Sequence, residues 1–407
     1  MLSQDAIENL VKPIVDRQEA INNYVIQKIA ERVREIGHLL PSDAYKLVTL
    51  YKRGADVREI NKEIARLTNL NERDIKKLIK DVAKDSYKDA KAYYDYRHKS
   101  YIPFEQNEPL QRIVKAVSER TAGSYINMSR AKAFMIRDLK NPTKLIPTII
   151  SKVYNSVIDE AIQIVQNGTV DYYTAMRRTM KQLNDSGIRY VTYHPESGRR
   201  YTQRLDTAVR RNVLDGIREI NQGVQDEVGK QFGADGKEIS VHANSAPDHE
   251  PIQGHQFTNE EFEKVQNHEP FQDYNGNKFD AFDRPIGQLN CRHFTYSIIL
   301  GITKPNYTQK QLDEFIRKNH EGYTTPDGRH MTMYECTQYQ RQLETKIRQA
   351  KDGQMMAKAA GDMDLVDEYQ AKVSDYTKKY KAFSEACGLS PKMQKARVSG
   401  YKRIRTN

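Results

Sequence analysis

The residue types most able to do chemistry gather in the only histidine-dense segment of the chain. This segment runs from Val241 to His255, and a short block, Asn290 to Phe294, follows further along. Together they hold four of the chain's ten histidines and one of its three cysteines. Imidazole nitrogen and thiolate sulfur are donors that zinc prefers, whereas an imidazole beside a carboxylate can act as a general base. The pattern therefore raises two possibilities, a metal site and a hydrolytic site.

The possible metal ligands are His242, His249, Cys291 and His293, with His255 as a further nitrogen donor. Their spacing is neither that of a zinc finger nor that of an HExxH helix. Cys291 and His293 are two positions apart, so an extended strand would place both side chains on one face. The alternative is a buried polar network that pins loops onto a small sheet. The sequence therefore does not decide whether a metal cofactor is bound, and zinc is the metal that these residues would favour.

A hydrolytic reading rests on Asp248 and His249, which could form an orienting pair for general-base catalysis. However, neither Ser240 nor Ser245 lies in a recognisable nucleophile motif, and the sequence has no glycine-rich phosphate loop. A nucleophile would be lacking unless a metal supplied hydroxide. We therefore expect no catalytic residue, and a metal-dependent hydrolase or nuclease built on the His/Cys cluster is the alternative.

The elements that must position these residues are mostly helices. Apolar residues recur at helical spacing over most of the chain, and this periodicity is lost between about 236 and 307. We predict a mainly α fold with a small α+β module. The predicted regions are an elongated helical partner-binding region (1–145), a helical connector with a small hairpin (146–235), the α+β module with the His/Cys motif (236–307), and C-terminal helices with a basic tail (308–407).

Capping and turn residues predict several boundaries. In the first half, we predict one helix that begins at Asp56 and Glu59 and another that begins at Asn71 and Asp74. A third helix is predicted from about Leu110 to Leu139, and Pro142 and Pro147 mark the boundary after it. In the second half, we predict a helix from Ile149 to Asn167, a hairpin of 188–193 with 199–202, and a strand within 294–300. Further helices are predicted to begin with capping boxes at Thr308 and Thr332, and a last helix runs from about Asp364 to Ala386.

The net charge of +11 favours attraction to polyanions, above all to nucleic acid. Two groups of basic residues are candidate phosphate contacts, although solvated surface is the plainer interpretation of both. The first group is Arg199, Arg200, Arg204, Arg210 and Arg211; the second, in an acid-free tail, is Lys392, Lys395, Arg397, Lys402, Arg403 and Arg405.

The cysteines and the hydropathy bear on the compartment. Three widely spaced cysteines predict no disulfide framework and favour a reducing environment. The first residues do not resemble a signal peptide, and no window approaches eighteen consecutive apolar residues. We therefore expect no membrane-spanning segment.

Several motifs of the chain resemble one family. The motifs are His242-Ala243, Pro247-Asp248-His249, Gln253-Gly254 and Asn290-Cys291-Arg292-His293, followed by Tyr334-Glu335-Cys336 in the C-terminal helices. This combination is similar to the core signature of minor capsid proteins of tailed phages that infect Gram-positive hosts, relatives of the MuF-like head morphogenesis proteins. Two positions depart from the family's usual pattern. Ile252 stands where an aromatic residue is usual, and Cys336 where a small residue is commoner.

The resemblance implies a low-copy structural protein of the virion. Such a protein is present in the host cytoplasm during assembly and then lies inside the head near the portal. Its implied partners are the portal protein, the major capsid or other head proteins, and double-stranded DNA bound without sequence preference. It can leave the head with the DNA. The signature residues implied as the structural motif are His242, Asp248, His249, Gln253, Gly254, Cys291, Arg292 and His293.

Overall fold

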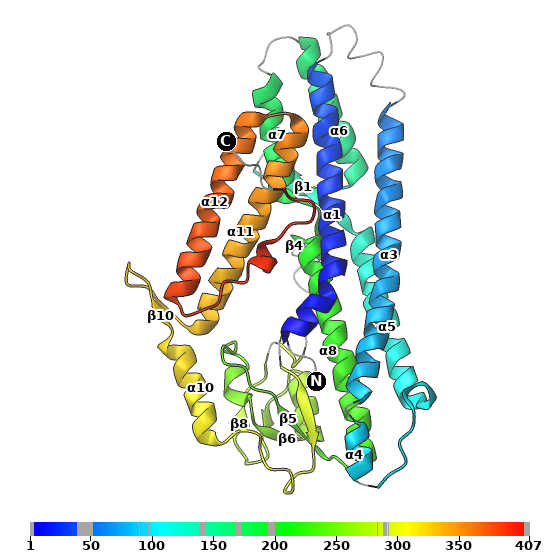
Figure 1. Ribbon diagram of the computed structural model, residues 1–407, viewed down its shortest axis with the longest axis vertical. Helices are drawn as coiled ribbons and strands as arrows, with labels where there is room; N and C mark the ends of the chain where they lie inside the picture. The colour runs from blue at the N-terminus through cyan, green and yellow to red at the C-terminus, as the bar shows by residue number, and fades with distance from the viewer. Residues whose placement is uncertain are drawn as a thin grey trace. The chain divides into compact units, whose positions relative to one another are not determined.

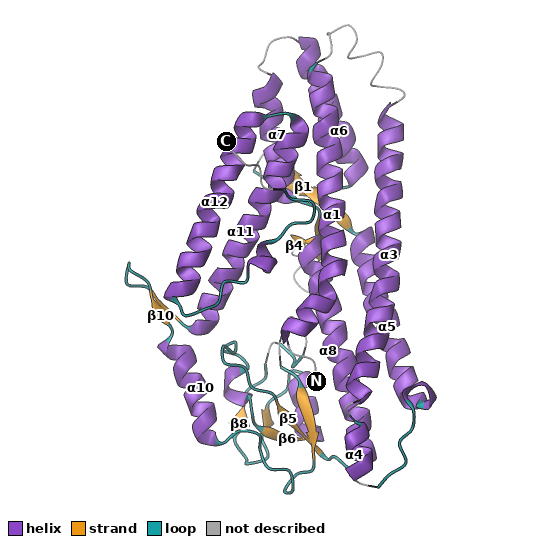
Figure 2. Ribbon diagram, in the orientation of Figure 1, coloured by secondary structure: helices purple, strands orange, loops and turns teal. Residues whose placement is uncertain are grey.

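The fold is mainly helical with a few small sheets, as the sequence predicts (Figures 1 and 2). The computed structural model describes residues 4–38, 52–88, 90–96, 98–137, 143–167, 172–193, 200–282, 284–287, 291 and 293–402. Two compact units are present. The first unit comprises Met1–Val11, Asp74–Ser124 and Arg211–Tyr339, and the second comprises Lys12–Arg73, Tyr125–Arg210 and Gln340–Asn407.

The first unit contains the predicted α+β module. Its sheet has the strand order β6-β5-β9, in which β5 (Gly236–Ile239) pairs antiparallel with both β6 (Gln256–Thr258) and β9 (Thr295–Ile298). A two-stranded hairpin, β7 (Phe271–Gln272) with β8 (Lys278–Phe279), lies beyond α9 (Asn259–Gln266). The pairing of β5 with β9 brings chain segments that are distant in sequence to one sheet.

Helices of the same unit support this sheet. Helix α8 (Leu205–Gln231) contacts β9, because the Gln222 side chain accepts a hydrogen bond from the Thr295 amide at 2.9 Å. Helix α10 (Gln309–Glu321) contacts the loop before β6, where Asn319 donates to Glu250 at 2.6 Å. The unit also contains α4 (Lys91–Tyr96), the 3-10 helix Phe104–Gln106, and the hairpin of β10 (Tyr323–Thr324) with β11 (His330–Met331).

The module has a small apolar core. Its buried members come from the strands, α9 and the loops: Ile239, Ile252, Phe257, Phe262, Val265, Phe271, Ile286 and Cys291. The strands are two to four residues long. So small a sheet buries little apolar surface, and its stability must depend on further interactions.

Two tyrosines of the first unit, Tyr87 and Tyr94, are part of a core rather than of a surface. Tyr87 and Tyr94 are 0% and 2% exposed. Tyr87 stacks on Tyr101, and Tyr94 meets Phe232 edge to face. These rings therefore stabilise the first unit internally.

The second unit combines helices with a four-stranded sheet. The strand order is β2-β1-β3-β4, and every neighbouring pair is antiparallel. The strands are β1 (Lys132–Arg137), β2 (Leu145–Thr148), β3 (Arg189–Tyr193) and β4 (Arg200–Arg204). The helices that belong wholly to this unit are α6 (Ile150–Asn167), α7 (Tyr172–Ser186) and α12 (Met363–Ala386).

Five long helices contribute residues to both units. They are α1 (Gln4–Gly37), α3 (Lys52–Lys88), α5 (Glu108–Arg130), α8 and α11 (Met333–Ala360). Each unit is thus assembled from separate chain segments, whereas the sequence analysis divides the chain into four consecutive regions. Within the described residues, no helix is both long enough and apolar enough to cross a membrane.

A buried ion network lies in the second unit. Arg204 contacts Asp206 at 3.2 Å and Asp352 at 3.1 Å, and all three side chains are at most 10% exposed. Burial opposes the charge of Arg204, but the two carboxylates raise its pKa. Burial would likewise raise the pKa of Asp206, yet Arg204 holds it below its usual value. The guanidinium therefore compensates the charge of Asp206, whereas burial still raises the pKa of Asp352 despite the contact with Arg204.

Most predicted boundaries are confirmed. The helix from Ile150 to Asn167 and the hairpin of β3 with β4 are present, and Gly187 ends α7 with a φ of 57°. Thr308 and Gln311 form the expected capping box, and Thr332 and Glu335 bond reciprocally at the start of α11. The predicted last helix is α12, which Asp362 caps. The turn at 195–198 lies outside the described residues.

Asn71 and Asp74 do not begin a new helix, because α3 continues through both. The Asn71 side chain is fully buried and donates to the Ile14 carbonyl at 3.2 Å. Asparagine favours a helix start when its side chain bonds to nearby backbone of the following turn. Here the side chain donates through Nδ2 to a distant carbonyl, and the residue lies buried inside α3 rather than at its start. Tertiary packing therefore overrides the local signal.

The helix predicted up to Leu139 ends at Arg130, and β1 follows. Pairing with β2 on one side and β3 on the other overrides the local helical pattern. Pro147, expected at a boundary, lies within β2. This strand is at the sheet edge, where a residue without an N–H group is tolerated. Pro142 lies outside the described residues.

We expect Arg204→Met to lower the free energy of unfolding by about 3–5 kcal/mol, because Asp206 and Asp352 would be left buried without a counter-charge. Urea denaturation of the full chain measures this change. Arg66→Ala is the control, because Arg66 pairs with Glu63 on the surface and should show no measurable change. Equal stability of Arg204→Met and wild type would contradict the compensating role of Arg204.

We expect the unfolding free energy to fall between pH 4.5 and about 8 through Glu19. Burial, followed by the charges of Asp206 and Asp352, raises the pKa of Glu19 from 4.5 to about 8 and outweighs Arg348. In this window the folded chain keeps a proton that the unfolded chain has lost, so rising pH favours unfolding by at most about 1.4 kcal/mol per pH unit. Glu19→Gln should flatten the slope and stabilise the chain near pH 8. Parallel pH profiles for the two proteins would contradict this assignment.

Candidate metal centre

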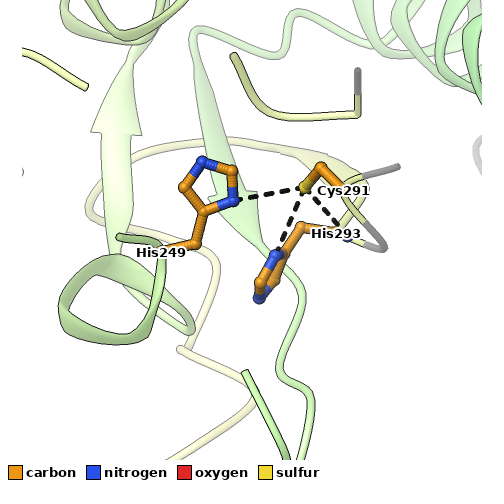
Figure 3. Close-up of side chains that lie close together, drawn as sticks. All are labelled: His249, Cys291 and His293. Carbon is orange, nitrogen blue, oxygen red and sulfur yellow. Dashed lines mark hydrogen bonds between the residues drawn. The ribbon is translucent and has the colours of Figure 1, made fainter. Parts of the chain in front are cut away.

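Three buried side chains of the first unit face one another (Figure 3). The Cys291 Sγ atom lies 3.3 Å from the His249 Nδ1 atom and 3.5 Å from the His293 Nδ1 atom. His249 is 0% exposed, Cys291 2% and His293 4%. One ligand atom from each lies within 4.8 Å of the others. The structure thus brings together three of the four residues predicted as possible metal ligands.

The backbone around each residue explains how they meet. His249 immediately precedes the 3-10 helix Glu250–Ile252, and its amide is bound by the Ala246 carbonyl and the Asp248 carboxylate, both at 3.0 Å. Cys291 and His293 lie in the loop that leads into β9. Because β9 pairs with β5, this loop returns to the segment that follows β5. The sheet therefore positions both halves of the cluster.

The His249 ring has a defined orientation. Its Nε2 atom lies 2.7 Å from the Arg284 carbonyl oxygen. A carbonyl only accepts hydrogen bonds, so Nε2 carries the proton in the neutral ring and Nδ1 presents a lone pair to the Cys291 sulfur. Arg284 is itself fixed by Asp248, whose carboxylate accepts two hydrogen bonds from its guanidinium at 2.9 and 2.7 Å.

The His293 ring is held between a hydroxyl and two neighbouring imidazoles. Its Nε2 atom is 3.5 Å from the Ser245 hydroxyl, on the opposite side of the ring from the sulfur contact. The ring centroid lies 4.6 Å from that of His242 and 5.5 Å from that of His249. The three predicted histidines are therefore neighbours, although the sulfur contacts involve only His249 and His293.

Burial determines the charge of the cluster. It lowers the pKa of His249, and burial followed by the neighbouring His242 lowers that of His293 to about 2. Burial also raises the pKa of the Cys291 thiol. Without a bound cation, all three groups are neutral near pH 7. A Cys–His pair needs a thiolate for nucleophilic catalysis, so this arrangement does not supply an activated nucleophile.

The remaining signature residues support the same loops. Gln253 accepts a hydrogen bond from the His242 amide at 2.9 Å. Gly254 has a φ of 77°, and a Cβ atom there would meet Leu312, so both the backbone conformation and the space require glycine. Arg292, predicted to face away from the cluster, lies outside the described residues.

Two expectations about the ligands need correction. Cys291 and His293 do not share a strand, because β9 begins at Thr295; their contact arises from a loop. His255 is not part of the cluster, since its Nδ1 atom bonds to the Asp273 carboxylate at 2.7 Å. That carboxylate also accepts from Asn277, so His255 belongs to the turn between β7 and β8.

Sequence reasoning missed the groups that orient the cluster. Arg284 enters through its backbone carbonyl, for which no sequence signal exists. Glu250 accepts hydrogen bonds from Asn319 and lies 2.8 Å from His320 of α10. The position of Glu250 directly after His249 was the one sequence feature that could have indicated its place near the cluster.

The predicted phosphate-binding arginines are only partly at the surface. Arg204 is enclosed by Asp206 and Asp352 and is unavailable to a phosphate in this structure. Arg210 and Arg211 are half-buried on α8. Arg200 belongs to β4, but its side chain and the whole of Arg199 are outside the described residues.

The basic tail is partly packed rather than wholly solvated. Ala396 and Val398 are buried, and Arg348 and Lys351 donate to the carbonyls of Lys395 and Ala396. Arg397 and Lys402 are exposed, whereas Lys392 and Lys395 are half-buried. Arg403 and Arg405 lie outside the described residues.

A second basic surface was not predicted. It consists of exposed lysines at helical spacing on α3 and α4, namely Lys76, Lys77, Lys80, Lys84, Lys88 and Lys91. Glu105 lies 3.6 Å from Lys80 and 3.3 Å from Lys84, which reduces the local charge. The three- and four-residue spacing of these lysines was a signal visible in the sequence.

A cavity of about 440 Å³ adjoins the cluster within the first unit. His293 and Phe294 line it together with residues of α5, α8 and α9, including Arg120, Arg218 and Gln266. The cavity therefore reaches one member of the His/Cys cluster.

Comparison with known proteins places the chain in a family. A family model described as phage minor capsid protein 2 matches residues 2–385. No curated protein and no solved structure matches the chain. The match covers nearly the whole sequence, including both halves of the His/Cys cluster. The chain therefore belongs to the phage minor capsid protein 2 family and is a structural component of a phage head.

Proposed function

We propose that this head protein is a low-copy component that binds the portal vertex inside the head and contacts packaged DNA. It binds the portal protein together with the major capsid or other head proteins, and it can be ejected with the DNA. The family match over residues 2–385 carries the proposal. A protein of the phage head is surrounded by other head proteins and by packaged DNA, so these are the partners that we propose.

The charge distribution supports contact with DNA. The chain carries a net charge of +11, and exposed basic residues occur on both the C-terminal tail and the α3–α4 surface. Scattered bases without a groove-reading motif favour phosphate contacts that are independent of sequence. The tail is favoured over α3 because it contains no acid, whereas Glu105 lies beside the lysines of α3.

The alternative of a metal-dependent hydrolase or nuclease has weaker support. Within the part of the chain that the structure describes, its candidate centre is buried and offers a thiol whose pKa burial raises. A structural role accounts for the same side chains, because each orients another within the loops of the module.

We expect the full chain to bind the portal directly, because the partner-binding helices present exposed polar faces such as that of α3. The test is co-expression of the full chain with portal and major capsid proteins, followed by lysine cross-linking and mass spectrometry. Residues 1–140 are not used alone, since they contribute to both compact units. Cross-links from Lys77, Lys80 or Lys84 to the portal support the proposal. Cross-links restricted to the major capsid protein would contradict portal binding.

We expect DNA affinity to fall with salt and to be equal for unrelated duplexes of one length. If the six bases of the tail neutralise six phosphates, log affinity against log salt has a slope of about −5. Replacing Lys392, Lys395, Arg397, Lys402, Arg403 and Arg405 with glutamine should flatten it in a fluorescence anisotropy titration.

The control removes the same number of charges from the α3–α4 surface, at Lys76, Lys77, Lys80, Lys84, Lys88 and Lys91. This variant should keep the wild-type slope. The opposite pattern would assign the contact to α3 and contradict the role of the tail. An affinity that does not change with salt would exclude the electrostatic account for both surfaces.

A further inference from the structure

We propose that His249, Cys291 and His293 bind one zinc ion, which fastens the loop before β6 to the loop before β9. The two loops are distant in sequence, and the cluster is where they meet (Figure 3). Neutral imidazole and thiolate are ligands that zinc prefers over the hard, oxygen-seeking cations.

Two of the three ligand separations match a tetrahedral zinc site. Bond lengths of about 2.3 Å for Zn–S and about 2.0–2.1 Å for Zn–N, at the tetrahedral angle, separate sulfur from nitrogen by roughly 3.5 Å. The Cys291 Sγ atom lies 3.3 Å from the Nδ1 atom of His249 and 3.5 Å from that of His293. Both separations are therefore those of ligands on one zinc ion.

In the metal-free chain, hydrogen bonds can form the same contacts. The Nε2 proton of His249 is directed to the Arg284 carbonyl, so its Nδ1 lone pair accepts from the Cys291 thiol. The His293 ring can carry its proton on Nδ1 and donate to the sulfur, to which the His293 amide also donates at 3.4 Å. A zinc ion would replace the two protons that lie between the sulfur and the nitrogens and would bind all three atoms directly.

The surroundings have the features of a second shell. Metal-binding histidines usually direct their other ring nitrogen to a carbonyl, a carboxylate or water, which fixes the ring. His249 directs Nε2 to the Arg284 carbonyl at 2.7 Å, and His293 has its Nε2 atom 3.5 Å from the Ser245 hydroxyl. The His293 amide also donates to the sulfur, at 3.4 Å.

A water molecule or a further imidazole completes such a three-ligand site. The His242 ring lies beside the cluster, with its centroid 4.6 Å from that of His293. The cavity of about 440 Å³ that His293 lines gives an access path for the ion.

The small core gives the metal a physical role. The sheet strands are three or four residues long, and the buried His249 and His293 contact Cys291, a member of the apolar core. A structural zinc ion converts such polar burial into stabilisation, because its binding free energy becomes folding free energy. Small modules with little apolar surface often require a metal for this reason.

The test uses the full chain, expressed with zinc and purified without chelators, and measures zinc per chain by inductively coupled plasma mass spectrometry. Wild type should hold one zinc ion, and Cys291→Ser and His293→Ala should lose it. Cys387→Ser and His330→Ala are the matched controls, because neither residue belongs to the cluster, and both should retain the ion. Cys291→Ser that retains zinc at the wild-type level would overturn the proposal.

A second measurement avoids variants that fold poorly. Wild-type chain stripped of metal and titrated with cobalt(II) should develop a sulfur-to-cobalt charge-transfer band and the intense visible bands of a tetrahedral site. Zinc should then displace the cobalt and remove the bands. Only weak bands of octahedral cobalt, together with wild-type protein that purifies without zinc, would also overturn the proposal.

Discussion

The arrangement of the α+β module depends on one sulfur atom that faces two imidazoles. Cys291 comes from the loop before β9 and His249 from the loop that follows β5, so their contact requires the β5–β9 pairing. The orientation of His249 in turn requires the Arg284 carbonyl, and Asp248 holds Arg284. Each polar group is therefore fixed by the next one. Removing any member would leave another buried without a partner, which is costly in an interior of low dielectric.

The two units bury their polar groups in different ways. In the second unit, the charge of Arg204 compensates Asp206 and Asp352, while Glu19 is kept protonated near neutral pH by burial. In the first unit, burial keeps the His/Cys cluster neutral, and a cation would have to displace the thiol proton of Cys291 to bind. The network of the second unit contains its own counter-charge, whereas the cluster of the first unit has the composition of a metal site. This contrast is the physical basis for assigning the metal to the first unit.

Local signals predicted the helices and the capping boxes, because short-range periodicity controls these features. The shared chemistry of His249, Cys291 and His293 grouped these residues in the sequence, although the long-range pairing of β5 with β9 is what brings them together. Local signals failed where distant partners decide the outcome. Asn71 is buried inside α3, where it donates to a carbonyl of α1, and the segment after Arg130 becomes a strand through its neighbours in the sheet. Arg204 shows the same limit for function. A run of arginines suggested a phosphate surface, but only the fold reveals that two carboxylates enclose this side chain.

For a structural component of a phage head, a metal-fastened module offers rigidity with little core, while exposed basic residues remain for partners and DNA. The most direct measurement of this account is X-ray diffraction from crystals of the full chain, recorded on both sides of the zinc absorption edge. The account predicts one anomalous peak, at about 2.3 Å from the Cys291 Sγ atom and about 2.0–2.1 Å from the Nδ1 atoms of His249 and His293. A well-ordered cluster without an anomalous peak, in protein prepared with zinc, would contradict it.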